Sequence, residues 1–470
     1  MPSTQHHKSR RQEFLGSIDT PVLLMAGGWI SRNYPANWMP YRADSTMLFF
    51  FPVVEPGSAA LFDPKDKSVT VFLDERTPED ALWHGTVPGF ADMKKILGVD
   101  AVVKRSELAA HVKKQCGKRK VMSLAVADPR ATAEAASITG EELDFFRAER
   151  VGHAVLVAAI AKLRNHKAPD ELAEMRRAAA ITRDAHVAAM ARTRAGLYEQ
   201  DLVGVVEGIF ARQGAVPAYN TILSVRGEVL HNHAHGNLLM EPDLVLLDAG
   251  AELASGYCAD VTRTWPVSGH FSAEARDVYD IVLAAEKAAI GMVKPGVRYR
   301  DVHLCAARVL TDGLVQMGLL KGASDGLVEA GAHALFFPHG VGHLLGLDVH
   351  DMEGFGDQIA YAKGRTRSDQ FGTAYLRLDI DLEPGMCVTI EPGIYFVPAI
   401  LQDKEMRARF KGMVDFKKAE TFLTMNNLRG FGGIRIEDDV LCTKSGHEVL
   451  TAAVPKERIA VEALVGSAVG

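Results

Sequence analysis

The pattern of apolar and polar positions divides the chain near residue 165. Upstream, apolar runs at 47–64 and 68–76 are broken by Pro56-Gly57 and Pro64-Lys65, which predicts strands joined by turns. Around 164–169 the sequence turns polar, and Pro169 stands where a helix can begin. We therefore predict one domain over residues 1–165 and a second over 166–470, since 470 residues are more than one core usually serves.

Beyond Pro169 the chain alternates pairs of helices with strand-like runs. Apolar residues from Leu172 to Ala189 recur at helical spacing, and a second helix is predicted from about Gln200 to Gln213. Later, Ser272 is a predicted cap of a helix that ends before Pro295-Gly296, and another helix follows over 300–318. The repeated order predicts a duplicated half, with helices outside and a curved sheet inside.

Composition narrows the class of protein. The net charge of −6 excludes the basic excess of a nucleic-acid-binding surface. The apolar run at 21–26 is too short for a signal-peptide core or a membrane span. The five cysteines are an odd number without a CxxC pair, which favours a reducing compartment over a disulfide framework. A soluble cytoplasmic protein without nucleic-acid or membrane partners is predicted.

Four acidic residues lie in or at the end of apolar, strand-like runs, where a lone charge is costly to bury. They are Asp248 in LVLLDAG, Asp260 in CADVTRTWP, Glu391 in CVTIEPGIYF and Glu437 in GIRIEDDV, and His343 lies in the glycine-rich stretch PHGVGHLLGLDVHD. Four carboxylates and one imidazole form a hard donor set dominated by oxygen. Such a set indicates Mn²⁺ or a similar divalent ion, and not a zinc site of the thiolate type. Five ligands are too many for one catalytic ion with an open position, so we predict two bridged ions that activate a shared water.

In this order and in these motifs, the five residues resemble the metal-binding set of the M24 metallopeptidases, the pita-bread fold of aminopeptidase P, prolidase and methionine aminopeptidase. PHGVGHLLGLDVHD, EPGIYF and RGFGGIRIEDDV are similar to the Xaa-Pro branch in particular. The resemblance covers about 165–455 well and the N-terminal third more loosely. It implies an α+β fold, with a pita-bread catalytic domain and a smaller α/β N-terminal domain.

The resemblance also implies a cofactor and roles for its ligands. Two divalent ions are expected, Mn²⁺ first, with Zn²⁺ or Co²⁺ as alternatives. Asp260 and Glu437 would bridge them, Asp248 would complete one ion, and His343 and Glu391 the other.

Further residues match the family's catalytic and substrate-binding positions. Glu391 is the implied proton acceptor and donor, His350 stabilises the intermediate, and His231 is a substrate-side histidine. On the substrate side the resemblance also implies His339, Arg377, Tyr395 and Arg435.

Three of these residues have an alternative interpretation, and the spacing of one pair departs from the family's pattern. His339 could instead be satisfied by backbone carbonyls, and Tyr395 could simply pack its ring. Arg377 could grip a free substrate carboxylate through paired hydrogen bonds or be an exposed arginine, since Ile380 stands where similar sequences often have a second arginine. Asp248 and Asp260 are twelve apart instead of the family's usual eleven, with a hairpin turn predicted at Ser255-Gly256.

The histidines that alternate at 231, 233 and 235 would face one way on a strand. We expect only His231 to belong to the site and place His233 and His235 in a solvated loop. The polar segment 354–381 is predicted to be a surface loop or lid.

The N-terminal domain looks like the one that accompanies aminopeptidase P and prolidase, where it helps assemble the oligomer and covers the cleft. A homodimer or homotetramer is therefore expected. Trp83 and His84 are candidates for reaching a neighbouring subunit's site, although a partly buried Trp83 without that role carries more weight.

The preferred hypothesis is a Xaa-Pro dipeptidase that hydrolyses the bond between an N-terminal residue and proline. The long segment 397–429, followed by GFGGIRIEDDV, is more similar to prolidases. The alternative is a Xaa-Pro aminopeptidase acting on longer peptides with proline second. Two weaker hypotheses are a non-catalytic pita-bread protein that binds peptides and a metal-free, creatinase-like amidinohydrolase.

Overall fold

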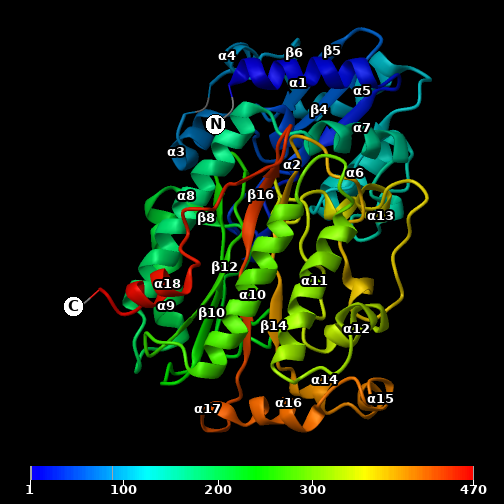
Figure 1. Ribbon diagram of the computed structural model, residues 1–470. Helices are drawn as coiled ribbons and strands as arrows, with labels where there is room; N and C mark the ends of the chain where they lie inside the picture. Colours follow the sequence, from blue (N-terminus) through cyan, green and yellow to red (C-terminus); the bar gives the residue numbers. More distant parts are fainter. Residues whose placement is uncertain (1–2, 87, 469–470) are drawn as a thin grey trace. The chain divides into compact units, whose positions relative to one another are not determined.

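The computed structural model describes residues 3–86 and 88–468 (Figure 1). Contacts separate the chain into two units. Unit 1 contains Met1–Glu171 together with Met352–Ile359, and unit 2 contains Leu172–Asp351 and Ala360–Gly470. A short stretch of the predicted lid therefore packs with the first unit, which sequence order alone did not indicate.

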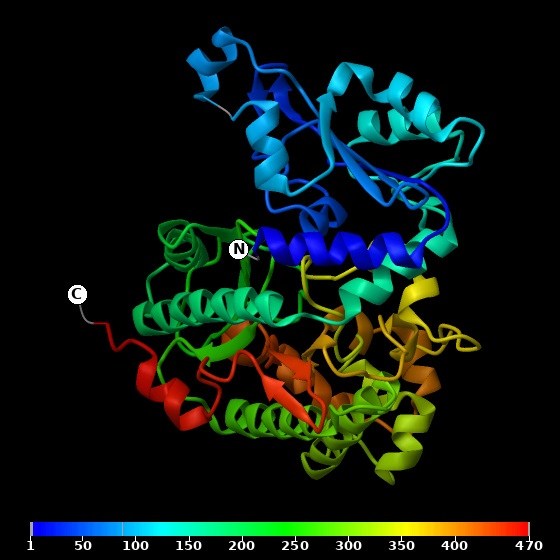
Figure 2. The same cartoon turned by 90° about the horizontal axis from the view of Figure 1, so that it is seen from above.

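Unit 1 is built on a five-stranded mixed sheet in the order β6-β5-β4-β1-β7, with helices packed on it (Figure 2). β1 pairs antiparallel with β4 and parallel with β7, so the sheet combines hairpin and crossover connections. Its core packs strand residues such as Leu61 and Phe72 against Leu108 and Val112 of α5. The elements are α1 Thr4–Ser17, β1 Val22–Met25, β2 Ser31–Tyr34, β3 Asn37–Trp38, α2 Ser45–Phe50, β4 Ala59–Asp63, β5 Ser68–Leu73, α3 Pro78–His84, α4 Phe90–Leu97, β6 Ala101–Lys104, α5 Leu108–Cys116, β7 Met122–Ser123, α6 Pro129–Thr139 and α7 Ala154–Asn165.

One predicted strand in this unit is wrong. Residues 45–50 form α2, because Asp44 caps the helix and accepts a hydrogen bond from the backbone N–H of Thr46 over 2.9 Å. A short apolar run has no periodicity that separates a strand from a buried helix. Only 59–63, at the end of the same run, pairs in the sheet.

Unit 2 follows the predicted order of two helix pairs, each followed by strands. Pro169 begins the first long helix, and the side chain of Ser272 accepts a hydrogen bond from the backbone N–H of Ala275 at the start of α10. The elements are α8 Pro169–Arg192, α9 Glu199–Arg212, β8 Ala215–Pro217, β9 Ile222–Ser224, β10 Leu244–Asp248, β11 Ala251–Leu253, β12 Thr262–Pro266, α10 Ala273–Met292, α11 Tyr299–Gln316, α12 Ser324–Ala330, α13 Asp357–Ala360 (which begins in the stretch assigned to unit 1), β13 Cys387–Ile390, β14 Gly393–Tyr395, α14 Pro398–Leu401, α15 Lys404–Arg409, α16 Phe416–Leu423, α17 Met425–Leu428, β15 Gly433–Arg435, β16 Asp438–Cys442, β17 His447–Val449 and α18 Arg458–Leu464.

The strands of unit 2 form several short sheets instead of one long ladder. Their orders are β12-β10-β9, β13-β16-β17, β11-β8 and β14-β15. Interruptions fall at Gly250, between β10 and β11, and at Pro392, between β13 and β14, where proline has no N–H for a ladder. Chain segments that end a short strand are thereby free to point side chains into the space between the sheets.

A tight hairpin connects the two predicted aspartate ligands. β10 and β12 pair antiparallel with Asp248 opposite Thr262, and the turn closes with a hydrogen bond from the Gly256 N–H to the Leu253 carbonyl over 2.7 Å. A side chain at Gly250 would place its Cβ 1.7 Å from the Ala259 carbonyl oxygen, so only glycine allows this close approach. The predicted turn is confirmed.

The segment predicted as a lid contains order of its own. Besides α13 it includes the short 3₁₀ helices Glu353–Phe355 and Thr373–Tyr375. Arg298 makes a paired hydrogen bond to Asp379 at 2.6 Å for each nitrogen, and Arg365 lies 2.8 Å from Asp381. Within 3–86 and 88–468, no helix is both long enough and apolar enough to cross a membrane.

Candidate metal centre and active site

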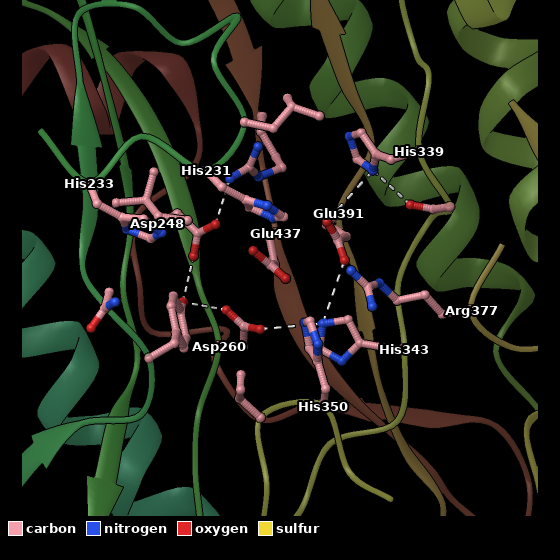
Figure 3. A pocket seen from close by; sticks show the side chains of 17 residues that line it. His231, His233, Asp248, Asp260, His339, His343, His350, Arg377, Glu391 and Glu437 are labelled. Carbon is pink, nitrogen blue, oxygen red and sulfur yellow. Dashed lines mark hydrogen bonds and ion pairs between the residues drawn. The ribbon is translucent and has the colours of Figure 1, made fainter. Parts of the chain in front are cut away.

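The five predicted metal ligands line one cavity of about 390 Å³ in unit 2. Their labelled side chains point into a common space (Figure 3). They arrive from strand ends and loops that are distant in sequence. The cavity is lined by Tyr219, Asn220, Ile222, Leu230, His231, His233, Asp248, Asp260, His339, Gly340, His343, Val349, His350, Arg377, Glu391, Arg435 and Glu437.

Three of the ligands form a compact donor cluster. Asp260, His343 and Glu437 each offer one ligand atom, and these atoms all lie within 4.8 Å of one another. The Nε2 atom of His343 is 3.4 Å from a carboxylate oxygen of Asp260 and 3.6 Å from one of Glu391. The other ring nitrogen, Nδ1, lies 3.0 Å from the Leu344 carbonyl, which accepts its proton, so Nε2 of the neutral ring keeps a lone pair that can bind a metal ion.

The electrostatics of the cluster favour a bound cation. Burial raises the pKa of Asp260 to about 7, and the neighbouring charge of Asp248 adds to the rise. Burial also raises the pKa of Glu391, and it raises that of Glu437 well above the usual range, where Asp260 contributes as a like charge. Carboxylates crowded in this way become stable in the ionised form when divalent ions lie between them. The hard, oxygen-rich donor set fits such ions.

Tyr219 is a site residue that the sequence analysis missed. Its buried hydroxyl lies 2.5 Å from Oδ1 of Asp248 and 2.5 Å from Oδ1 of Asp260, so its proton can be donated to either carboxylate. The only sequence signal was a tyrosine in the turn-like stretch PAYN between two short apolar runs. That signal carries no chemistry until the fold brings the two aspartates to the tyrosine.

A hydrogen-bond chain runs along one wall of the cavity and contains three predicted substrate-side residues. Arg435 donates to Asp248 over 2.5 Å and to the hydroxyl of Tyr395 over 3.0 Å. The Tyr395 hydroxyl lies 2.9 Å from Nε2 of His339, and Nδ1 of His339 lies 2.8 Å from the Gly340 carbonyl. Burial, together with the positive charge of Arg435, lowers the pKa of His339 to about 3, so this imidazole is neutral and accepts from Tyr395.

The same chain decides between the alternatives left open for two residues. Tyr395 is fully buried, as the packing alternative requires, yet its hydroxyl is also paired on both sides. His339 does meet a backbone carbonyl, but only through one nitrogen, and it lines the cavity. His339 therefore lies at the cavity as well as against the backbone, whereas Tyr395 is packed in the interior and contacts two residues that line the cavity.

The histidine-rich loop differs from the prediction. Residues 231, 233 and 235 lie in irregular backbone and not on a strand. His231 lines the cavity as predicted, but His233 lines it too, whereas Nδ1 of His235 lies 3.1 Å from the Leu223 carbonyl. Buried Glu199 ties both ends of this loop, accepting from the backbone N–H of Val225 over 2.8 Å and that of Asn237 over 3.1 Å.

Two further predicted residues lie at the cavity. The ring of His350 is 4.2 Å from that of His343, measured between centroids, and Arg377 lines the wall. Apolar residues Ile222, Leu230 and Val349 complete the lining. The cavity therefore joins a polar, metal-type wall to an apolar surface that could receive a small ring.

Trp83, a candidate for a role at a neighbouring subunit's site, belongs to unit 1. It lies on α3 with 72% of its surface exposed in the single chain, so the expectation of a partly buried tryptophan is wrong. The ring of His84 lies 5.8 Å from that of Trp38.

Comparison with known proteins identifies the class. The family model described as metallopeptidase family M24 matches residues 173–444, and that of the aminopeptidase P N-terminal domain matches residues 7–123. The chain belongs to metallopeptidase family M24 and is an enzyme of that family, with a pita-bread catalytic domain and an aminopeptidase P-type N-terminal domain. Members of the class depend on divalent metal ions, in agreement with the donor cluster.

Particular relatives span nearly the whole chain. A Xaa-Pro aminopeptidase of Escherichia coli is 32% identical over 99% of this chain and 98% of its own length. A human Xaa-Pro dipeptidase is 32% identical over 95% of this chain and 88% of its own. Among solved structures, E. coli aminopeptidase P in complex with substrate has a TM-score of 0.81 at 31% identity, covering 99% and 98% of the two chains. Aminopeptidase PepP of Pseudomonas aeruginosa has a TM-score of 0.80 at 30% identity, covering 99% and 98%.

Proposed function

We propose that this enzyme is a Xaa-Pro aminopeptidase that uses two divalent ions, with Mn²⁺ as the preferred metal. It would release an N-terminal residue that precedes proline in peptides longer than two residues. The comparisons favour this alternative over the dipeptidase that the sequence analysis preferred. The match to the E. coli aminopeptidase covers both chains almost completely, whereas that to the human dipeptidase leaves more of the relative uncovered.

The single observation that carries the proposal is the convergence of Asp248, Asp260, His343, Glu391 and Glu437 on one cavity. In our assignment Asp260 and Glu437 would be shared by both ions, Asp248 would bind one of them, and His343 and Glu391 would bind the other. When bound, a pair of divalent ions makes a water nucleophilic at neutral pH, and the same ions polarise the scissile carbonyl.

The remaining steps fall to side chains of the protein. Glu391 lies beside His343, and burial raises its pKa, which suits a group that takes a proton from the attacking water and returns it to the leaving proline nitrogen. His350 and His231 would donate to the oxyanion that develops on the carbonyl. The pKa of His231 is lowered by burial first and by Arg435 second.

Arg435 and Tyr395 would hold this arrangement in register. Arg435 would hold the Asp248 carboxylate in its orientation toward the ions through a 2.5 Å hydrogen bond. His339, held neutral by burial, would orient the Tyr395 hydroxyl on the substrate side, because its Nε2 accepts from that hydroxyl.

One feature favours a second candidate, the Xaa-Pro dipeptidase. Arg377 lines the cavity, and a guanidinium can hold the free carboxylate of a dipeptide through two parallel hydrogen bonds. If Arg377 performs that task, dipeptides should be the better substrates.

Peptide length separates the two candidates. Steady-state kinetics of the Mn²⁺-loaded enzyme on Gly-Pro, Gly-Pro-Gly and Gly-Pro-Gly-Gly should give a higher kcat/KM for the longer peptides. A preference for Gly-Pro that is lost in Arg377→Ala would establish the dipeptidase. Full activity in a chelator would favour a creatinase-like amidinohydrolase, and metal binding without hydrolysis would favour a non-catalytic binding protein.

Location and assembly belong to the same proposal. None of the five cysteines forms a disulfide in the described part of the chain, which supports the proposal of a reducing, cytoplasmic compartment. We also propose a homodimer or homotetramer, with exposed Trp83 reaching a neighbouring site. Light scattering of the wild type, and kinetics of Trp83→Ala at equal oligomeric state, would test both points.

A further inference from the structure

Arg263 is a fully buried arginine that faces away from the candidate metal centre. It follows Thr262 on β12, and successive strand residues point to opposite faces. The hydroxyl of Thr262 reaches Glu437 over 2.6 Å on the cavity side, so Arg263 lies behind it. Its side chain is 0% exposed, as is that of its partner Asp438.

All five N–H donors of the Arg263 guanidinium have an acceptor. Nη1 donates to the carbonyl of Glu437 over 2.6 Å and to that of Thr262 over 2.9 Å. Nη2 donates to Asp438 Oδ1 over 2.8 Å. The remaining contacts are Nη2 to the Val454 carbonyl at 3.0 Å and Nε to the Pro455 carbonyl at 3.0 Å. A lysine, with three donors at a single point, cannot reproduce this set.

These contacts cross a junction between two sheets. β12 belongs to the sheet β12-β10-β9 and β16 to the sheet β13-β16-β17, and across the described residues no ladder pairs β12 with β16. The backbone N–H of Glu437 donates to the Thr262 carbonyl over 3.1 Å, and Arg263 binds both of the carbonyls at this point. The Arg263 side chain thus links β12, the strand that follows Asp260, to the backbone of Glu437.

The far side of this junction is held by a second cation. Asp438 accepts from Lys456 over 2.7 Å as well as from Arg263, and Lys456 also donates to Glu286 over 2.6 Å. Lys456 shares the buried acid with Arg263, but among the described residues its ammonium contacts Asp438 and Glu286 and not the carbonyl of Glu437 or Thr262. It therefore offers a matched comparison in which buried charge is lost without loss of the strand junction.

We propose that Arg263 is a positioning residue that sets the separation of Asp260 and Glu437 and thereby the affinity for the metal pair. The inference depends on the proposed function, since it takes these two carboxylates as the bridging ligands. Their ligand atoms, with that of His343, already lie within 4.8 Å of one another. Metal coordination tolerates departures of only about 0.2 Å in ligand distance, so a junction that loosens should lower metal affinity before the fold is lost.

Titration with Mn²⁺ alone tests the inference. Metal-free wild type, Arg263→Lys and Lys456→Met would be titrated while the signal of free Mn²⁺ is followed by electron paramagnetic resonance, and their thermal unfolding measured without metal. Both variants should unfold at lower temperature. Only Arg263→Lys should bind Mn²⁺ at least tenfold more weakly, with Lys456→Met within twofold of wild type.

Two results would overturn the positioning role. Wild-type Mn²⁺ affinity in Arg263→Lys is one, and an equal loss in Lys456→Met is the other, because the effect would then be general destabilisation. If Arg263→Lys does not fold, Arg263→Gln/Asp438→Asn removes both opposite charges and leaves no orphaned acid from the pair; the same comparison and the same outcomes apply. A wild type that binds no Mn²⁺ would instead overturn the ligand assignment itself.

Discussion

Arg435 donates a hydrogen bond of 2.5 Å to Asp248, although 187 residues separate them in the sequence. Both side chains are buried, with Arg435 only 4% exposed. Breaking a buried ion pair by removing one partner typically costs about 3–5 kcal/mol, because the other charge is left without compensation. The pair therefore fixes the orientation of a proposed metal ligand.

Arg435→Met should lower kcat/KM for a Xaa-Pro tripeptide by about 100-fold or more, because Asp248 loses its partner and Tyr395 loses a donor. The matched control is Arg183→Met. That residue pairs with Asp184 at the surface, where such pairs contribute little. Equal losses in the two variants would refute a specific role for Arg435.

Removing either bridging carboxylate should abolish activity while sparing the fold. Asp260→Asn and Glu437→Gln preserve side-chain shape but remove a charge that the ions require, so bound metal, measured by elemental analysis, should fall together with hydrolysis. The unfolding temperature of the metal-free variants should equal or exceed that of the metal-free wild type, because one of several buried like charges has been removed. Glu448→Gln at the surface serves as the control, and wild-type rates in a metal-replete Asp260→Asn enzyme would contradict the assignment.

Glu199→Gln should affect catalysis without affecting metal content. Glu199 accepts from the backbone at both ends of the loop that carries His231, and the amide would set a donor against one of those N–H groups. We expect kcat/KM to fall about tenfold with bound metal unchanged. Asp201→Asn, which changes an exposed capping acid on the same helix, should leave the rate near that of wild type. A drop of similar size in Asp201→Asn would mean that helix stability, and not the loop, is responsible.

Acid should destabilise the catalytic unit through a buried histidine pair. The ring centroids of His303 and His333 lie 6.4 Å apart. Burial lowers the pKa of His303 to about 3, and the nearby His333, His339 and Arg300 add to the effect. Burial lowers the pKa of His333 to about 4. Because the folded pKa lies below the unfolded value of 6.5, the stabilisation is complete above pH 6.5 and is lost as pH falls toward 4. Each histidine contributes a loss of about 1.4 kcal/mol per pH unit in that window.

Replacement of one histidine isolates this effect. His303→Phe places an apolar ring beside Phe337, 5.3 Å from the present imidazole, and should flatten the dependence of unfolding free energy on pH between 6.5 and 4. Chemical denaturation at several pH values measures it. An unchanged slope in His303→Phe would refute the explanation.

The sequence alone indicated the candidate site residues that lie in recognisable local motifs. Asp248, Asp260, His343, Glu391 and Glu437 stand in apolar or glycine-rich contexts that make a polar side chain costly unless it has a task. The four long helices α8 to α11 were also predictable, because caps and helical periodicity are local signals.

The residues that support the site were not predictable in the same way. Tyr219 reaches Asp260 across 41 residues and Arg263 reaches Asp438 across 175, so neither partner is visible near the other in the sequence. Residues 47–50, which lie in α2, were predicted to be part of a strand because a short apolar run has no diagnostic period. The alternation of His231, His233 and His235 would have aligned their side chains only on a strand, whereas the backbone there is irregular and held by Glu199.

Anomalous diffraction at the manganese edge, from crystals of the Mn²⁺-loaded protein, tests the central claim most directly. Two adjacent peaks are predicted among Asp248, Asp260, His343, Glu391 and Glu437, with the carboxylates of Asp260 and Glu437 between them. A single peak, or peaks outside this cavity, would contradict the account.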